Sequence, residues 1–259
     1  MRPRKSLGQH FLADANLARA IAREAGAGPG ERILEIGAGL GSLTLAMVQA
    51  GAEVLAVEVD PALVPALNEV VGWTARARVV ELDAARADWG EVLGEGAWRM
   101  ASNLPYNVAV PVVMGLLEGA PSVDPMLVMV QREVGERLAA GPGEEAYGGV
   151  SVRVAYRASA KVVRRIPPTV FWPEPRVESV LVRLERRPPP VDVPEAELFR
   201  LIEEGFHQRR KTMANALVRL GVERARAVEV LEGAGLDPRV RAEELGLEEL
   251  ARLVELLRD

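Results

Sequence analysis

The sequence predicts an α/β protein in which a doubly wound, mostly parallel sheet is followed by a small all-helical domain. Over the first two-thirds of the 259 residues, short apolar runs alternate with stretches of helical periodicity. This alternation is typical of a parallel sheet that helices cover on both faces. Prolines at 188–190 and 194 then interrupt the pattern, because proline fits neither a helix interior nor a central strand. Beyond these prolines only helical periodicity remains.

The individual elements follow in order along the chain. Apolar runs predict buried strands at residues 32–36, 53–58, 78–82, 98–102 and 126–130. Helices are expected at 43–50, at 61–71 with Pro61 in the first turn, and after Pro111. A late β-branched run at 177–184 predicts a strand added at the edge of the sheet. Leucine-rich stripes predict C-terminal helices around residues 198–206, 217–220 and 247–257.

The composition excludes several kinds of site. The chain has no cysteine, which excludes disulfides, zinc ribbons, iron–sulfur clusters and thiol catalysis. Its two histidines, His10 and His207, are far apart, and no carboxylates have metal-ligand spacing, so we expect no metal site. No apolar run approaches the ~18 residues of a membrane span. Because the N-terminus also lacks the apolar core of a secretory signal, we expect a cytoplasmic protein with no membrane partner.

The net charge of −5 conceals a basic segment, since residues 151–190 carry a net charge of +6. A basic segment of this kind can be an electrostatic footprint for phosphate, or it can be a solvated arginine-rich face. The charge pattern alone leaves both interpretations open.

A glycine-rich loop after the first predicted strand indicates a ligand site. Gly37, Gly39 and Gly41 separate this strand from the next helix, and glycine lets the backbone approach a ligand without a Cβ atom. In an open α/β sheet, ligands bind at the carboxyl ends of the strands. Glu58 ends the second strand, where its carboxylate can accept hydrogen bonds from both hydroxyls of a ribose. Together these residues predict a cofactor that contains adenosine, and the alternative is an ordinary strand–helix turn.

The residues around this loop favour S-adenosylmethionine over NAD. The dinucleotide fingerprint requires a third glycine where this chain has Ser42, and no basic residue accompanies the loop to hold a pyrophosphate. Glu35, just before the loop, suits a cationic group and would repel phosphate. S-adenosylmethionine carries an ammonium and a sulfonium group but no phosphate. Asp83, after the third strand, can accept a hydrogen bond from the adenine amino group.

The segment Asn103, Leu104, Pro105 and Tyr106 follows the fourth strand and predicts chemistry on an adenine amine. The lone pair of this amine is delocalised into the ring, so the nitrogen needs acceptors that draw its hydrogens out of the ring plane. The side-chain oxygen of Asn103 can accept one hydrogen bond, and a backbone carbonyl near Leu104 or Pro105 can accept the other. Tyr106 can stack on an extruded base. An ordinary turn is the alternative interpretation.

Nine segments in a fixed order resemble the motifs of a known family over nearly the whole chain. They are residues 7–12, 35–41, 58–60, 83–84, 103–106, 131–134, 147–151, 171–179 and 206–211. In that family these segments include the boxes G-Q-N-F-L, E-I-G-x-G-x-G, E-x-D, N-L-P-Y, F-x-P-x-P-K-V-D-S and F-x-Q-R-R-K. The sequence is thereby identified as a member of the ribosomal RNA adenine N6,N6-dimethyltransferases. It departs from the family pattern at His10, where Asn is usual, and more mildly at Arg176 and Glu178.

The resemblance implies what the protein does and how it is organised. Residues 1–187 would form a Rossmann-like, S-adenosylmethionine-dependent methyltransferase domain, and residues 191–259 a helical domain that binds rRNA. The enzyme would dimethylate N6 of two adjacent adenosines near the 3′ end of 16S rRNA in the immature small (30S) ribosomal subunit. A role in small-subunit biogenesis and a monomeric state are also expected.

The resemblance also implies roles for individual residues. Cofactor contacts are expected at His10, Leu12, Gly37, Gly39, Glu58, Asp83 and Asn103. Adenine contacts are expected at Asn103, Leu104, Pro105 and Tyr106, with Phe171 as a second aromatic face for the base. RNA phosphate contacts are expected at Arg209, Arg210 and Lys211. The alternatives are core packing for Phe171 and a solvated helix start for the three basic residues.

Four other functions compete with this hypothesis. A 23S rRNA dimethyltransferase of the antibiotic-resistance type shares most of these motifs, but the basic run at 206–211 favours the small-subunit enzyme. A DNA adenine methyltransferase would typically carry D-P-P-Y rather than N-L-P-Y. A non-catalytic ribosome assembly factor would not need residues 103–106 intact. A dehydrogenase would bind NAD, which Ser42 disfavours.

Overall fold

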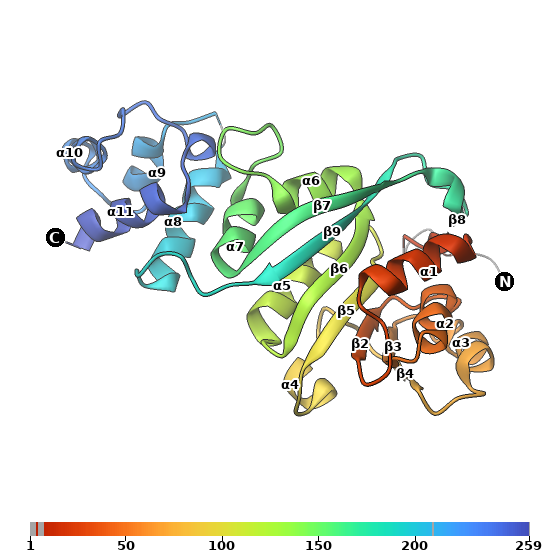
Figure 1. The fold of residues 1–259 in the computed structure, drawn as a ribbon. Coiled ribbons are helices and arrows are strands. Elements are labelled where there is room, and N and C mark those ends of the chain that lie inside the picture. The colour runs from red at the N-terminus through yellow and green to blue at the C-terminus, as the bar shows by residue number, and fades with distance from the viewer. Residues whose placement is uncertain (1–3, 5–7, 209, 259) are drawn as a thin grey trace. The chain divides into compact units, whose positions relative to one another are not determined.

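A seven-stranded sheet in the order β4-β3-β2-β5-β6-β9-β7 organises the first part of the fold (Figure 1). The computed structural model describes residue 4, residues 8–208 and residues 210–258. Strands β2 to β6 pair in parallel, and β9 pairs antiparallel with β6. The strands are β2 (Arg32–Ile36), β3 (Glu53–Glu58), β4 (Ala77–Glu81), β5 (Trp98–Asn103), β6 (Val123–Gln131), β7 (Ala158–Ile166) and β9 (Ser179–Arg186). This arrangement confirms the predicted α/β fold class.

The strand order reverses between β2 and β5. From β2 the chain continues to β3 and β4 on one side, and it then returns to place β5 and β6 on the other side. Such a reversal separates the two loops that follow the central strands and opens a crevice at their carboxyl ends. The glycine loop follows β2, and residues 103–106 follow β5, so both predicted segments lie at the reversal.

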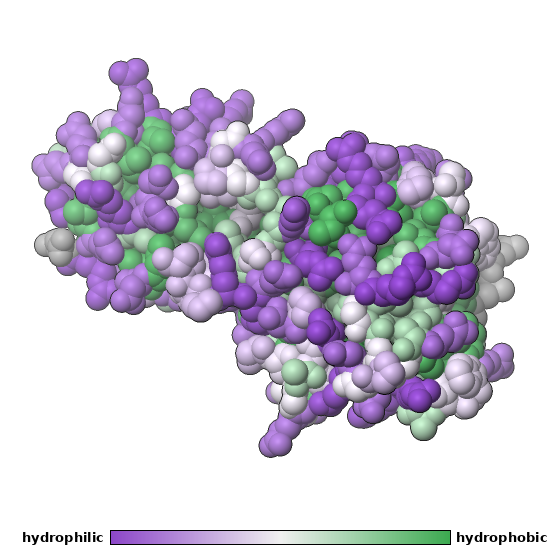
Figure 2. Space-filling model, viewed as in Figure 1, coloured by the Kyte–Doolittle hydropathy of each residue, from purple (hydrophilic) through white to green (hydrophobic). Residues whose placement is uncertain are grey.

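Helices cover both faces of this sheet. In Figure 1, α1, α2 and α3 lie together on one side, and α4 and α5 lie on the other. Asp14 begins α1 by accepting hydrogen bonds from the backbone N–H groups of Asn16 and Leu17 at 2.8 and 3.0 Å. The buried face of α1 is apolar, and its outward face is hydrophilic in Figure 2. The helices are α1 (Ala15–Glu24), α2 (Ser42–Gln49), α3 (Val64–Val71), α4 (Trp89–Leu93), α5 (Ala109–Gly119) and α6 (Arg132–Ala139).

A two-stranded sheet ties the N-terminal segment to a late part of the chain. β1 (Phe11–Leu12) pairs antiparallel with β8 (Phe171–Trp172), which follows the short 3-10 helix η2 (Pro168–Val170). The pairing sets Phe11 opposite Trp172 and Leu12 opposite Phe171. Leu12 and Phe171 are buried in the same apolar cluster as Ile21 of α1 and Ala101 of β5.

The chain divides into two compact units. The first contains residues 1–135 and 160–186, and the second contains residues 136–159 and 187–259. In the second unit, Tyr156 of α7 meets Phe199 of α8 edge-on, with ring centroids 5.2 Å apart. Aromatic pairs prefer this edge-on geometry. The elements of this unit beyond α6 are α7 (Gly149–Arg157), α8 (Glu195–His207), α9 (Met213–Arg219), α10 (Arg224–Gly233), η3 (Ala242–Glu244) and α11 (Leu247–Arg258).

The structure differs from the predicted elements in three respects. β9 is not the edge strand, because β7 flanks it on the side away from β6. The helices α1, α4, α6, α7 and α10, the strand β7 and the β1–β8 pair were not predicted individually. Residues 136–159 also belong to the helical unit, whereas the predicted boundary assigned them to residues 1–187. Within the described part of the chain, no helix is long and apolar enough to cross a membrane.

Candidate functional site

A cavity lies at the carboxyl ends of β2, β3 and β5, where the strand order reverses. Its lining comes from three parts of the first unit: residues 8–12, the loops after β2 and β3, and the loop after β5. Nine of the predicted site residues line it: His10, Leu12, Gly37, Gly39, Glu58, Asn103, Leu104, Pro105 and Tyr106. The structure therefore brings most of the predicted cofactor and adenine residues to one place.

The glycine loop is in close contact with its neighbours on two sides. Gly37 has a φ of +75°, and a Cβ atom there would lie 3.0 Å from Cδ of Pro105. Gly39 has a φ of +57°, and a Cβ atom there would lie 2.9 Å from Cδ1 of Phe11. Glycine is required at both positions, because other residues rarely adopt positive φ and would clash. The close contacts bring the N-terminal segment and the loop after β5 against the glycine loop.

Glu58 is buried at the end of β3 and accepts two backbone hydrogen bonds. Its Oε2 accepts from the Gly39 N–H at 2.8 Å, and its Oε1 accepts from the Asp60 N–H at 2.9 Å. Burial raises the pKa of Glu58, and these backbone donors oppose the increase. Each carboxylate oxygen has two lone pairs, so both oxygens keep acceptor capacity for further donors such as ribose hydroxyls.

Glu35 is a second buried carboxyl group in the cavity lining. Its side chain is almost inaccessible, and its Oε2 accepts a hydrogen bond from Oγ1 of Thr44 at 2.5 Å. Burial, with a smaller contribution from the charge of Glu58, raises the pKa of Glu35 to about 8. The carboxyl group is therefore protonated at neutral pH unless a cation lies next to it. A cationic ligand group at this position would favour the ionised form.

The side-chain amide of Asn103 is oriented by the N-terminal segment. Its Nδ2 donates to the backbone carbonyl of His10 at 2.9 Å, which leaves Oδ1 as the acceptor. The backbone N–H of Leu104 donates to the carbonyl of Met129 at 3.0 Å and so fixes the loop to β6. The Pro105 carbonyl accepts from the Val108 N–H at 3.1 Å. None of the described residues donates to the Leu104 carbonyl, so this carbonyl has more free acceptor capacity than that of Pro105.

Tyr106 is held from two directions. Its hydroxyl is hydrogen-bonded to Oγ of Ser179 at 2.8 Å, and burial raises the pKa of this phenol. The His10 ring stacks on Tyr106 with centroids 5.2 Å apart and an interplanar angle of 27°. His10 Nδ1 lies 2.7 Å from the carbonyl of Pro173, to which it donates. Because His10 covers one face of the Tyr106 ring, a base can stack only on the opposite face.

The remaining predicted residues do not line the cavity. Asp83 is half-exposed, accepts from the Ala85 N–H at 3.0 Å and lies 3.7 Å from Arg86. Phe171 is buried in the core, which corresponds to the alternative interpretation for this residue. Arg210 and Lys211 are exposed in the helical unit, in the turn between α8 and α9. Arg209 lies outside the described residues.

Three residues at the site were given no role by the sequence analysis. Thr44 bonds Glu35, Ser179 bonds Tyr106, and Asp60 is buried with partners from the N-terminal segment. Asp60 and Ser179 stand inside recognised motifs, which is the only sequence signal for them. Their roles depend on partners that are distant in the chain, 51 residues away for Asp60 and Gln9 and 73 for Ser179 and Tyr106.

Solved structures share this fold. A dimethyladenosine transferase from Plasmodium falciparum superposes with a TM-score of 0.79 at 20% identity, covering 96% of this chain and 98% of that one. The 23S rRNA methyltransferase ErmE superposes with a TM-score of 0.72 at 24% identity, covering 96% of this chain and all of that one. At such low identities these matches support the fold alone.

Closer relatives and a family model cover nearly the entire sequence. The ribosomal RNA small subunit methyltransferase A of Moorella thermoacetica is 43% identical, over 97% of this chain and 91% of that protein. Its counterpart in Kineococcus radiotolerans is 46% identical, over 98% of this chain and 85% of that protein. The model of the family described as ribosomal RNA adenine dimethylase matches residues 1–259. The resemblance found in the sequence is thus confirmed, and the chain belongs to the ribosomal RNA adenine dimethylase family.

Proposed function

We propose that the protein transfers methyl groups from S-adenosylmethionine to N6 of two adjacent adenosines near the 3′ end of 16S rRNA. The observation that carries this proposal is the contact between the two halves of the cavity. The N-L-P-Y loop that suits an adenine amine packs directly on the glycine loop, where Gly37 lies against Pro105. A methyl donor on the glycine side and an amine acceptor on the other side would share one small volume, and this proximity favours transfer.

The lining suits S-adenosylmethionine. Two glycines allow close backbone approach, Glu58 offers acceptors for ribose hydroxyls, and Glu35 offers a carboxyl group for an ammonium. The described lining contains no lysine or arginine that would hold a pyrophosphate, which disfavours NAD. When bound, the cofactor would supply an electrophilic methyl group on its sulfonium. Asp83 does not line the cavity, but its carboxylate accepts only the Ala85 N–H among described hydrogen-bond donors and keeps capacity to accept from the adenine amino group.

Asn103 and Leu104 would prepare the target amine. Oδ1 of Asn103 and the Leu104 carbonyl would each accept one N–H of the amine, which draws the hydrogens out of the ring plane. The nitrogen lone pair is then directed at the methyl group without a strong base. Tyr106 would stack on the extruded adenine with the face that His10 leaves open. In the second transfer only one N–H remains, so pocket space must replace one of the two acceptor contacts.

The choice of 16S rRNA follows from the relatives. Those that are 43% and 46% identical over nearly the full chain carry the name of a small-subunit enzyme, which favours this substrate over 23S rRNA. The exposed Arg210 and Lys211 would contact RNA phosphates in the helical unit. We further propose that a monomer acts in the cytoplasm on the immature 30S subunit, so that docking also contributes to subunit assembly.

The test uses labelled S-adenosylmethionine and small subunits that lack the modification. Digested RNA should contain N6,N6-dimethyladenosine at the two adjacent sites, and Asn103→Ala should slow its formation by about 10²-fold or more. Asn68→Ala is the matched control, since Asn68 is exposed on α3 and its side chain bonds only the Val64 carbonyl among described residues. Label in large-subunit RNA would instead assign the protein to the resistance-type enzymes. If the protein bound the small subunit tightly but transferred no methyl group, the result would favour a non-catalytic assembly factor.

A further inference from the structure

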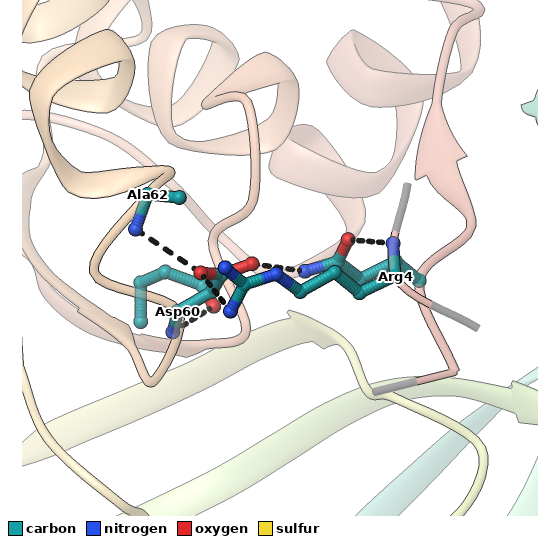
Figure 3. Close-up of polar contacts among 5 residues, drawn as sticks. Arg4, Asp60 and Ala62 are labelled. Carbon is teal, nitrogen blue, oxygen red and sulfur yellow. Dashed lines mark hydrogen bonds and ion pairs between the residues drawn. The ribbon is translucent and has the colours of Figure 1, made fainter. Parts of the chain in front are cut away.

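Asp60 is a buried carboxylate that joins two distant parts of the chain (Figure 3). Its side chain is only 3% exposed. Oδ1 accepts a hydrogen bond from the Ala62 N–H at 3.0 Å and lies 3.0 Å from Nη1 of Arg4. Oδ2 accepts from Nε2 of Gln9 at 2.9 Å. Arg4 and Gln9 belong to the N-terminal part of the chain, whereas Ala62 follows β3. Asp60 therefore joins the N-terminal part to the loop after β3.

The part of the chain that Asp60 holds, residues 8–12, forms one side of the cavity. Residues 8–12 all contribute to its lining. Arg4 and Gln9 also brace each other, because the Arg4 N–H donates to Oε1 of Gln9 at 2.8 Å. Directly after Gln9, the His10 carbonyl receives the hydrogen bond from Asn103. The position of this segment therefore determines where His10 and Leu12 lie against a bound ligand.

The charge of Asp60 favours the position that residues 8–12 occupy in the structure. A buried carboxylate is costly unless donors satisfy it. If residues 8–12 moved away, Asp60 would lose the donors from Arg4 and Gln9 and keep only the Ala62 N–H among its three described partners. Glu58 would make this loss more severe, because its carboxylate is hydrogen-bonded to the Asp60 N–H at 2.9 Å and repels the second charge. Arg4 supplies the compensating positive charge.

We propose that Asp60 is a positioning residue that latches residues 8–12 across the cavity and thereby sets the affinity and residence time of S-adenosylmethionine. It acts through Gln9 and Arg4, because its own side chain is absent from the cavity lining. The identity of the ligand rests on the proposed function, whereas the latch itself rests on the contacts of Asp60.

Variants of the two N-terminal partners test the latch without disturbing the turn at Ala62. Gln9→Ala and Arg4→Ala should each raise the dissociation constant and the KM for S-adenosylmethionine by roughly 3- to 10-fold, as expected for loss of one charge-assisted contact. In Arg4→Ala the kcat at saturating cofactor should stay within about twofold of wild type, because Arg4 does not line the cavity and acts on binding rather than on the reacting atoms. Arg4→Lys should keep most of the affinity that Arg4→Ala loses. Asp60→Asn should weaken S-adenosylmethionine binding more than Arg4→Ala or Gln9→Ala does.

Arg19→Ala is the matched control. Arg19 is an exposed arginine of α1 that bonds Asn16 at 2.7 Å and does not line the cavity, so its removal should leave cofactor binding unchanged. A second measurement needs no cofactor. Amide hydrogen exchange over residues 8–12 should accelerate in Arg4→Ala and Gln9→Ala but not in Arg19→Ala.

The outcomes separate the latch from the proposed function. Unchanged affinity and unchanged exchange in both Arg4→Ala and Gln9→Ala, with normal binding by wild type, would overturn the latch alone. If wild type itself does not bind S-adenosylmethionine, the proposed function fails, and the exchange measurement still decides whether Asp60 holds the segment.

Discussion

The Asn103 side chain donates a hydrogen bond to the His10 carbonyl at 2.9 Å, although the two residues are 93 positions apart. One amide group thus joins the loop after β5 to the N-terminal segment with its nitrogen and keeps its oxygen for the target amine. Because a carboxylate has no donor, the two roles of Asn103 can be separated by substitution.

Replacing Asn103 with aspartate keeps the acceptor and removes the donor. The ionised carboxylate would also repel the His10 carbonyl, so we expect Asn103→Asp to weaken S-adenosylmethionine binding as well as transfer. Asn103→Ala should reduce kcat by about 10²-fold or more, in the range of other lost transition-state contacts. Single-turnover methylation with separately measured cofactor affinity distinguishes the two effects. Equal cofactor affinity in Asn103→Asp and wild type would contradict a role for the His10 contact.

Cofactor binding should release a proton from Glu35. This carboxyl group has a pKa of about 8 in the structure, so it is protonated at pH 7, and the ligand ammonium would favour its ionised form. Titration calorimetry at pH 7 in buffers of different ionisation enthalpy should detect the released proton, and the release should disappear well above pH 8. Glu35→Gln should bind more weakly and without proton release at any pH. Proton release that persists in Glu35→Gln would assign it to another group.

The same group gives the ligand-free protein a defined pH dependence. The unfolded chain ionises Glu35 near its ordinary value of 4.5, whereas the folded chain keeps the proton until about pH 8. The contribution of Glu35 to stability is therefore complete below pH 4.5 and is lost as pH rises through 8. Glu35→Gln should thus gain in unfolding free energy relative to wild type between pH 5 and 8, as measured by urea unfolding.

Gly39 should be essential for the close packing of residues 8–12 against the glycine loop. A Cβ atom at this position would lie 2.9 Å from the Phe11 ring, so Gly39→Ala should displace residues 8–12 and raise the KM for S-adenosylmethionine by about tenfold or more. Gly30→Ala is the control, because Gly30 also has a positive φ, +85°, but has no atom within 4 Å of a Cβ. Both variants carry backbone strain, and only Gly39→Ala should alter cofactor binding. If Gly39→Ala and Gly30→Ala raised the KM for S-adenosylmethionine equally, backbone strain rather than the contact with Phe11 would explain the effect.

Arg186 should be a principal contributor to the stability of the first unit. Its guanidinium donates to the carbonyls of Leu116, Leu117 and Ala120 at the end of α5, at 2.7, 3.0 and 2.8 Å, and to that of Val123. The last carbonyls of a helix lack the full set of intrahelical donors, and α5 has no basic residue in its last turn. The Leu116 carbonyl accepts one further hydrogen bond, from the Ala120 N–H at 2.9 Å, and the Ala120 carbonyl accepts one from the Val123 N–H at 3.0 Å.

A lysine at this position cannot reach four carbonyls at once. We therefore expect Arg186→Lys to reduce the unfolding free energy by about 2–4 kcal/mol. Arg164→Lys, at an exposed pair with Glu24, should stay within about 0.5 kcal/mol. Thermal and urea unfolding measure the stability of both variants. If Arg186→Lys lost as little unfolding free energy as Arg164→Lys, the α5 carbonyls would be satisfied by other donors.

The predictable strands are those buried on both faces. β2 and β3 agree with their predicted bounds, because a strand covered on both faces is a continuous apolar run. β7 was missed because half of its residues face solvent, and Lys161, Arg164 and Arg165 make the run look like a basic patch. Without β7, the following strand was assigned to the edge.

The site was predictable where its residues follow successive strands. Gly37 directly follows β2, and Glu58 and Asn103 end β3 and β5, so the topology brings all three to the carboxyl ends of the strands. β1 has two residues, which is too short for any periodicity, and its partner β8 is 160 positions away. The sequence assigned a cofactor contact to Asp83, which is half-exposed, and no role to Asp60, which is buried and bonded to Gln9, because the partners of Asp60 are also distant in the chain.

The division of the helical unit into two chain segments determines the order in which the nascent protein can mature. Residues 136–159 are synthesised before the sheet is complete, and α7 contributes Val152 and Tyr156 to a cluster whose other members include Leu198 and Leu201 of α8. The sheet can close as soon as Arg186 has been added. The apolar face of α7 must wait for the C-terminal helices, and until they are synthesised it stays exposed to chaperones and to aggregation.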